Sequence, residues 1–134
     1  MPVDSRESLE CRATAAVLRS GESVALAGHV AAIISAVSIW HRLNWVSFCA
    51  LLVWFAVVYL SIRVKIDASF FELLATYPAD QFDRWLHDSG LRTNPPLRSM
   101  MDRQRGALRL WRALVASLVV ELALMTLGMV QLLR

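Results

Sequence analysis

The chain has 134 residues, of which 57% are apolar and only 19% are charged, and its formal net charge is +3. A soluble domain usually carries about a quarter charged residues, so this composition excludes disordered and low-complexity chains and favours a small membrane protein or an unusually apolar helical domain. The length excludes a large multidomain enzyme, and two cysteines in different contexts do not support a disulfide scaffold.

Residues 1–22 are expected to form a cytoplasmic N-terminal helix. Asp4 and Glu7 have the spacing of a capping box, and Gly21 can terminate the helix. Its apolar stripe is weak, which leaves two arrangements open. The helix lies on the inner membrane surface, or it is a loosely packed terminal helix.

Three segments are apolar enough to cross a membrane. They are residues 23–42, 45–63 and 112–133. Apart from Arg42, Arg63 and Arg112 at their ends, they contain one charged residue, Glu121. Because about 20 apolar residues cross the hydrocarbon core of a bilayer, these segments predict transmembrane helices. A soluble bundle with buried helices is the alternative, but the second segment has no polar face.

The distribution of Lys and Arg predicts the orientation. Three arginines precede the first span and nine basic residues lie between the second and third, whereas the first turn and the C-terminus have one each. The positive-inside rule therefore places the N-terminus in the cytoplasm and the C-terminus outside. The expected fold is an all-α protein of the inner (cytoplasmic) membrane with three transmembrane helices.

Residues 64–111 are predicted to form a cytoplasmic helical hairpin between the second and third spans. The second span continues past the membrane as a helix, and another helix begins at Pro78 and ends at Gly90. The prolines in residues 92–96 predict a loop before a basic helix that enters the third span. The apolar faces of the hairpin predict contacts with another subunit or the membrane, through Phe70, Phe71, Phe82 and Trp85.

Glu121 is the main candidate for a functional residue. It lies roughly 12 Å inside the third span at 1.5 Å per residue, and an ionisable group at that depth usually faces protein or water. His29, Trp54 and Tyr59 fall in the same half of their spans. This intramembrane polar group is interpreted as a proton or cation site, as a structural hydrogen bond between helices or subunits, or as a contact with a partner.

No cofactor and no metal are expected. A haem bound through His29 normally needs a second well-placed histidine, and the second and third spans contain none, which leaves only a haem shared between two copies. No zinc spacing, phosphate loop or nucleophile elbow appears. The acidic and histidine residues of one predicted hairpin helix are interpreted as a solvated face rather than a metal site; they are Asp80, Asp83, His87 and Asp88.

Two further features indicate partners. Gly28 and Ala32 have the small-xxx-small spacing that allows helices to pack closely, against another span, a second copy or another protein. A basic run precedes the third span and is expected to bind anionic lipid headgroups rather than nucleic acid. It consists of Arg98, Arg103, Arg105, Arg109 and Arg112.

These features favour a non-enzymatic subunit or scaffold of a larger membrane assembly, bound to other membrane subunits or to itself. The alternative is an oligomeric channel or a proton- or cation-coupled transporter that uses Glu121. A haem-binding redox subunit is the third hypothesis.

Overall fold

The computed structural model describes residues 5–41, 45–77, 81, 84, 87–90 and 99–133. Within these residues the long elements are the helices α1 (Ser5–Arg19), α2 (Gly21–His41), α3 (Trp45–Leu74) and α5 (Met100–Leu133), and none is a strand. Three stretches are long and apolar enough to cross a membrane: Arg6–Trp40, Trp45–Leu74 and Met100–Gln131. The prediction of a helical chain with three helices able to span a membrane is therefore confirmed.

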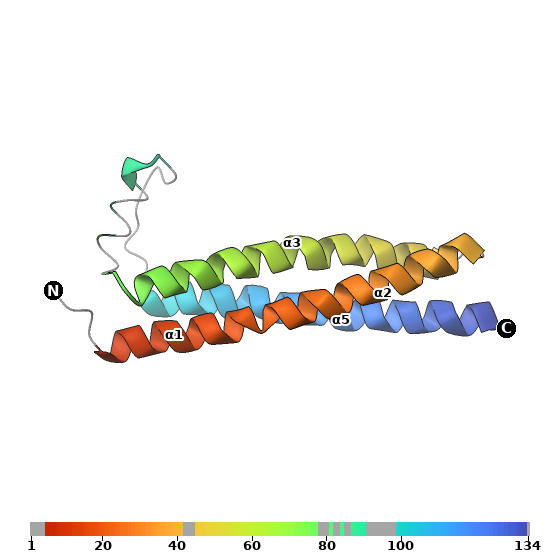
Figure 1. Ribbon diagram of the computed structural model, residues 1–134, viewed down its shortest axis with the longest axis horizontal. Coiled ribbons are helices and arrows are strands. Elements are labelled where there is room, and N and C mark those ends of the chain that lie inside the picture. Colours follow the sequence, from red (N-terminus) through yellow and green to blue (C-terminus); the bar gives the residue numbers. More distant parts are fainter. Residues whose placement is uncertain are drawn as a thin grey trace.

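Helices α1 and α2 follow one another along nearly one line and together form a rod (Figure 1). The break falls at Ser20, whose hydroxyl and backbone N–H both donate to the carbonyl oxygen of Val17, at 2.6 and 3.2 Å. The side chains of Cys11 and Leu18 are buried in one core cluster with residues of α3 and α5. The N-terminal helix thus continues the line of α2 and packs into the bundle, which differs from the loosely packed terminal helix that we considered.

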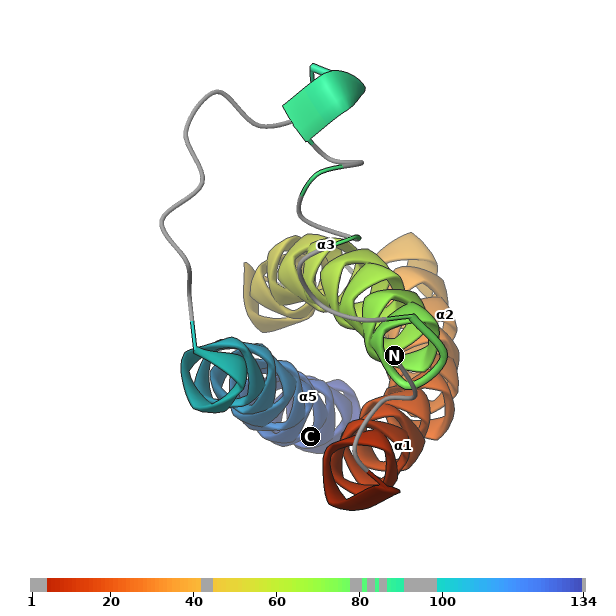
Figure 2. The same cartoon turned by 90° about the vertical axis from the view of Figure 1, so that its left-hand side faces the viewer.

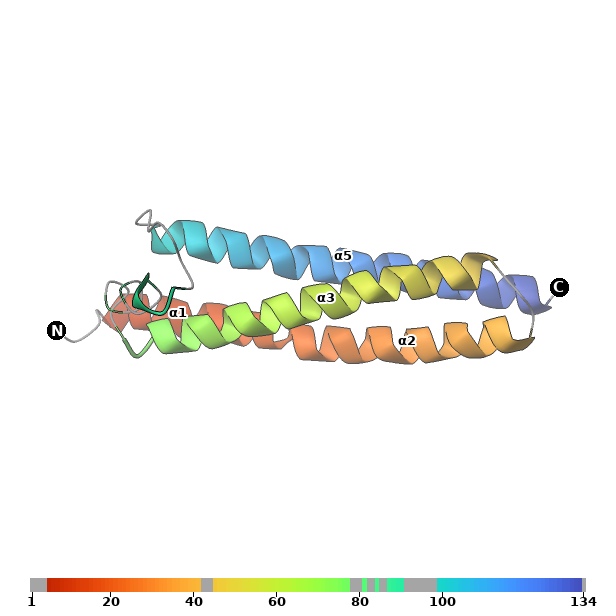
Figure 3. The same cartoon turned by 90° about the horizontal axis from the view of Figure 1, so that it is seen from above.

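The helices are longer than the apolar segments within them. At 1.5 Å per residue, the 30 residues of α3 and the 34 residues of α5 measure about 45 and 51 Å, against about 30 Å of hydrocarbon. We call the end near Trp40 and Trp45 the turn end, and the end where α1 begins the basic end. The excess length lies at the basic end, where α1, α3 and α5 run side by side (Figure 3).

Buried residues recur every seven positions in all three rods. Viewed along its length, the bundle places the α1–α2 rod, α3 and α5 around a common axis (Figure 2). The residues that face this axis are Thr14, Gly21, Gly28 and Ser35 in the rod, Ala50, Val57, Val64 and Phe71 in α3, and Ala107, Leu114, Glu121 and Gly128 in α5. A seven-residue repeat is typical of helices packed as a left-handed coiled coil.

The two glycines of the rod show how these positions align. A side-chain carbon placed on Gly21 would lie 3.2 Å from Val64 and 3.3 Å from Leu114. One heptad further along, a carbon on Gly28 would lie 2.9 Å from Val57 and 3.1 Å from the Glu121 carboxylate. The two layers are therefore equivalent, and Glu121 occupies the core position that Leu114 fills in the layer before it.

The composition of the core changes at Glu121. Toward the basic end, large apolar side chains fill it, including Leu18, Val64, Phe71 and Leu114. Toward the turn end, the buried side chains among the described residues are small or carry hydroxyl groups; they are Ala31, Ala32, Ser35, Ser38, Ser47 and Ala50. Glu121 thus lies at the boundary between an apolar half and a small, partly polar half.

Only part of the predicted hairpin falls among the described residues. His87 and Asp88 are helical, and the helix ends at Gly90, whose φ of 70° is typical of a glycine that terminates a helix. The backbone N–H of Gly90 donates to the carbonyl oxygen of His87 at 3.0 Å. The faces predicted for Phe82 and Trp85 lie outside the described residues, as do Asp80 and Asp83.

Candidate functional site

Glu121 lies in the interior of the bundle with 0% of its surface exposed. Neither oxygen of its carboxyl group has a hydrogen-bond partner among the described residues. A buried polar group normally has a partner, because leaving one unmade costs about 1–3 kcal/mol and more for a charge. The carboxyl group is therefore buried without the hydrogen-bond partner that it would normally have in the described part of the chain.

Gly28 makes the space for this carboxyl group. A side-chain carbon at position 28 would approach Oε2 of Glu121 to 3.1 Å and Cγ1 of Val57 to 2.9 Å, both closer than ordinary van der Waals contact. Any other residue at position 28 would thus compete with Glu121 for the same volume. Gly28 and Ala32, the predicted small-residue pair, are both buried inside this chain, and Gly28 faces α3 and α5.

His29 and Trp54 lie beside this layer. Their rings make an edge-to-face contact with centroids 5.8 Å apart, which joins α2 to α3. The Nδ1 atom of His29 is hydrogen-bonded to the carbonyl oxygen of Ala25, so this nitrogen is the protonated one. The indole N–H of Trp54 is buried and, like Glu121, has no partner among the residues described.

Tyr59 does not belong to this group. Its side chain is 62% exposed on the outer surface of α3, two residues past Val57, which faces the core. Of the four residues predicted to form an intramembrane polar site, the structure thus pairs His29 with Trp54 and places Glu121 against Gly28, the residue before His29. Sequence reasoning missed Ser35, one heptad from Gly28 toward the turn end, whose hydroxyl is buried and also lacks a partner in the described part of the chain.

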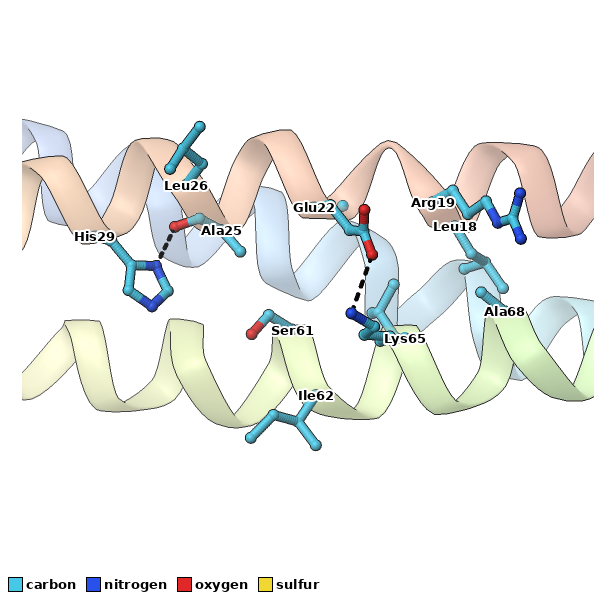
Figure 4. A pocket seen from close by; sticks show the side chains of 12 residues that line it. Leu18, Arg19, Glu22, Ala25, Leu26, His29, Ser61, Ile62, Lys65 and Ala68 are labelled. Carbon is cyan, nitrogen blue, oxygen red and sulfur yellow. Dashed lines mark hydrogen bonds and ion pairs between the residues drawn. The ribbon is translucent and has the colours of Figure 1, made fainter.

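A groove of about 410 Å³ runs between the α1–α2 rod and α3 on the basic side of His29 (Figure 4). Its rim carries charged side chains, with Lys65 Nζ 3.2 Å from a carboxylate oxygen of Glu22. Ser61 and His29 lie deeper along it and Arg19 at its far end (Figure 4). The groove therefore connects the charged end of the bundle to the imidazole of His29.

The basic end is held together by contacts between distant parts of the sequence. Arg19 forms an ion pair with Glu72, and the Ser8 hydroxyl donates to the carbonyl oxygen of Ala75 at 3.1 Å. The indole N–H of Trp111 donates to the Ser20 hydroxyl at 3.3 Å. These contacts join the rod to α3 and α5, so the helical extensions form one unit.

The remaining predicted site residues lie at the basic end. Arg105, Arg109 and Arg112 are exposed on α5 and Arg103 is half-buried, whereas Arg98 lies outside the described residues. Phe71 is buried in the core, and Phe70 is 37% exposed on the outer face of α3. Among the described residues, no group of three or more His, Cys, Asp or Glu side chains could hold a metal ion.

No family model, curated protein or solved structure matches this chain. Its function is therefore inferred from its own geometry.

Proposed function

We propose that this chain is a small multi-pass protein of the inner membrane and a non-enzymatic subunit of a larger membrane assembly. The outer face of α3 contacts the partner, which is a helix of a different membrane protein. The observation that carries the proposal is a row of exposed apolar side chains on α3 that continues past the end of its apolar span.

The row begins at the turn end, follows one side of α3 and continues to Tyr77, three residues past the end of the helix. Its members are exposed by 43–75% and include five aromatic side chains; they are Trp45, Phe48, Leu52, Phe55, Tyr59, Ile62, Ile66, Leu73 and Tyr77. Within the span, lipid can cover such side chains, so the first six positions by themselves do not indicate a partner.

The last three positions are different. Leu73 lies 11 residues beyond Ile62, which places it about 16 Å further along the helix. The charged residues Arg63 and Lys65 lie between these two positions, at the level where the hydrocarbon ends. Leu73 and Tyr77, exposed by 43% and 54%, are thus apolar surface outside the lipid, and a row of this kind indicates a protein contact.

The charges beside the row favour a different chain over a second copy. Two copies in the same membrane orientation, paired about a two-fold axis through α3, would bring Arg63 of one copy toward Arg63 of the other. Like charges at such positions are destabilising. The partner helix therefore has an apolar face that extends beyond the membrane.

The orientation follows from the basic residues. We infer that the basic end faces the cytoplasm, because it holds most of the Lys and Arg side chains. The exposed arginines Arg105, Arg109 and Arg112 of α5 then lie at the level of the anionic headgroups, where each contributes about 1 kcal/mol of attraction. The inner membrane, the partner and this lipid contact are all parts of the proposal.

The experiment places Asp at Leu73 in the full-length chain and purifies it from native membranes in mild detergent. We expect the wild type to co-purify with a foreign membrane protein in fixed stoichiometry and the Leu73→Asp variant to lose it. Native mass spectrometry measures the composition of both complexes.

The matched control is Leu9→Asp, because Leu9 is an equally apolar exposed residue at the same end but lies on α1. It should retain the partner. The proposal is wrong if the wild type purifies alone, if it forms only homo-oligomers, or if both substitutions release the partner equally.

A further inference from the structure

We propose that Glu121 is a proton-binding site that exchanges its proton with the turn end of the bundle, through the core lined by serine hydroxyls. This site is independent of the outer face of α3 and of any partner bound there. The reaction is the addition of one proton to the carboxylate to give the neutral carboxyl group, and its release by the same route.

The first argument is the state of the carboxyl group. Glu121 is 0% exposed, lies within an apolar span, and has no hydrogen-bond partner for either oxygen among the described residues. An unpaired charge is costly in such surroundings, so the neutral form is the stable one when the site is closed. A carboxyl group that must be neutral when closed and can ionise when hydrated is a carrier of one proton.

The second argument is the asymmetry of the core. On the basic side of Glu121, the next core layer consists of Gly21, Val64 and Leu114, which offer no polar side-chain atom. The groove that reaches His29 borders Gly21 and Val64 between the rod and α3, but Val64 and Leu114 are buried and keep the core itself closed on this side. On the turn side, buried hydroxyls follow at Ser35, Ser38 and Ser47. A serine hydroxyl both donates and accepts hydrogen bonds, so it can pass a proton along a chain of hydroxyls and water.

The hydroxyl of Ser35 is placed to be the first member of this chain. It lies one heptad from Gly28, which is about 10 Å along the helix axis, and is buried with no partner among the described residues. The next hydroxyl, that of Ser38, donates to the carbonyl oxygen of Ile34 at 2.9 Å and lies 3.6 Å from the sulfur of Met129. The half of the core toward the turn end is thus lined by small side chains and serine hydroxyls.

Few other titratable groups face Glu121. Helix α2 contributes His29, which lies within electrostatic range of the carboxyl group. The span in α3 contributes no charged residue, and its Tyr59 and Cys49 are exposed on the outer surface. On α5 the nearest other charged residue is Arg112, nine positions away. Among the residues that the structure describes, His29 is therefore the group whose charge would couple to that of Glu121 at close range.

The first test asks from which side the proton comes. Full-length protein is reconstituted in vesicles sorted for one orientation with a C-terminal tag, and the pH is set separately on the two sides. A hydrophobic carbodiimide, which reacts with protonated carboxyl groups, is added, and modification of Glu121 is measured by peptide mass spectrometry. We expect labelling to fall as the turn-side pH rises, by about tenfold per pH unit once the group ionises.

The test has two internal controls. The peptide that contains Glu22, a surface carboxylate beside Lys65, reports general reactivity, and Glu121→Gln confirms the site of modification. Labelling that does not depend on the pH of either side, or that depends on the pH at the basic end, overturns the proposal. Because the wild type alone gives this result, it does not depend on the folding of a variant.

The second test addresses the route. Infrared difference spectra after a pH jump on the turn side follow the C=O band of the protonated Glu121. We expect Ser35→Ala to slow its appearance about tenfold, because the variant removes the first hydroxyl of the route and raises the barrier to proton transfer by about 1.4 kcal/mol. The matched control is Ser61→Ala, because Ser61 lines the groove on the other side of the site, and this variant should react at the wild-type rate. Equal slowing by both, or by neither, overturns the serine route.

Discussion

The carboxyl group of Glu121 fills the volume that Gly28 leaves empty: a side-chain carbon on Gly28 would lie 3.1 Å from Oε2. The two residues come from different spans and are 93 positions apart, yet any side chain at position 28 would compete with the Glu121 carboxyl group for the same space. Gly28 is therefore best understood as half of a polar site, in addition to being a point of close helix packing.

Gly28→Ala should destabilise the bundle, because the added carbon must displace Glu121, Val57 or the α2 backbone. Overpacking of this kind costs about 1–3 kcal/mol. Thermal unfolding in detergent, followed by circular dichroism, measures the loss. Gly106→Ala is the matched control, since Gly106 lies in α5 with no atom within 4 Å of the added carbon, and it should raise stability by about 0.5–1 kcal/mol.

The pair can also be tested for coupling. If Glu121 is the group that Gly28→Ala displaces, then adding Glu121→Ala should recover part of the lost stability. The two effects would then differ from additivity by about 0.5–3 kcal/mol, as residues in contact do. Strictly additive effects would show that the clash is with Val57 alone.

Glu121→Met should make the bundle more stable. Methionine has nearly the same length and no polar oxygen, so it removes a buried carboxyl group that has no partner among the described residues. The expected gain is about 1–3 kcal/mol in the free energy of unfolding. The same measurement on Leu114→Ala, at the equivalent position one heptad earlier, should show a loss of about 2–5 kcal/mol. A loss for both variants would mean that Glu121 has a partner that stabilises it.

The sequence predicted the helices but not how they pack. Charge-free segments are sufficient to locate membrane-spanning helices, because the cost of charge in lipid is large, and Glu121 stands out for the same reason. The seven-residue core pattern was not predicted, since the contrast between polar and apolar faces that reveals a helix period is absent when every face is apolar. For that reason Tyr59 was assigned to the interior and Ser35 was overlooked. The seven-residue spacing places Ser35 in the core, seven residues after Gly28, and Tyr59 on the outside, two residues after Val57.

The two cysteines should differ in reactivity for structural reasons. Burial, reinforced by the carboxylates of Glu7 and Glu10, raises the pKa of the Cys11 thiol, so less of the reactive thiolate is present at neutral pH. In a Cys49→Ser variant, a water-soluble maleimide should therefore label Cys11 slowly. Labelling should accelerate as the pH is raised and become fast after unfolding in detergent and urea.

In the reciprocal Cys11→Ser variant, the remaining Cys49 is exposed within the part of α3 that is apolar enough to cross a membrane. A lipid-soluble maleimide should label it and a water-soluble one should not. Fast labelling of Cys11 by the water-soluble reagent in the folded protein would contradict the packing of α1 against α3 and α5.

The orientation of the bundle decides which side of the membrane each proposal refers to. With the basic end in the cytoplasm, a reporter that is active only outside the cytoplasm should be active when fused after residue 134 and inactive when inserted at residue 94. A reporter that is active only in the cytoplasm should give the opposite pattern, and this pair of fusions is its own control for expression. The physical cause is the excess of Lys and Arg around α1 and between α3 and α5, so replacing arginines of that end should weaken the preference. Activity of the first reporter at residue 94 would show that the bundle has the opposite orientation. The serine-lined half of the core would then face the cytoplasm.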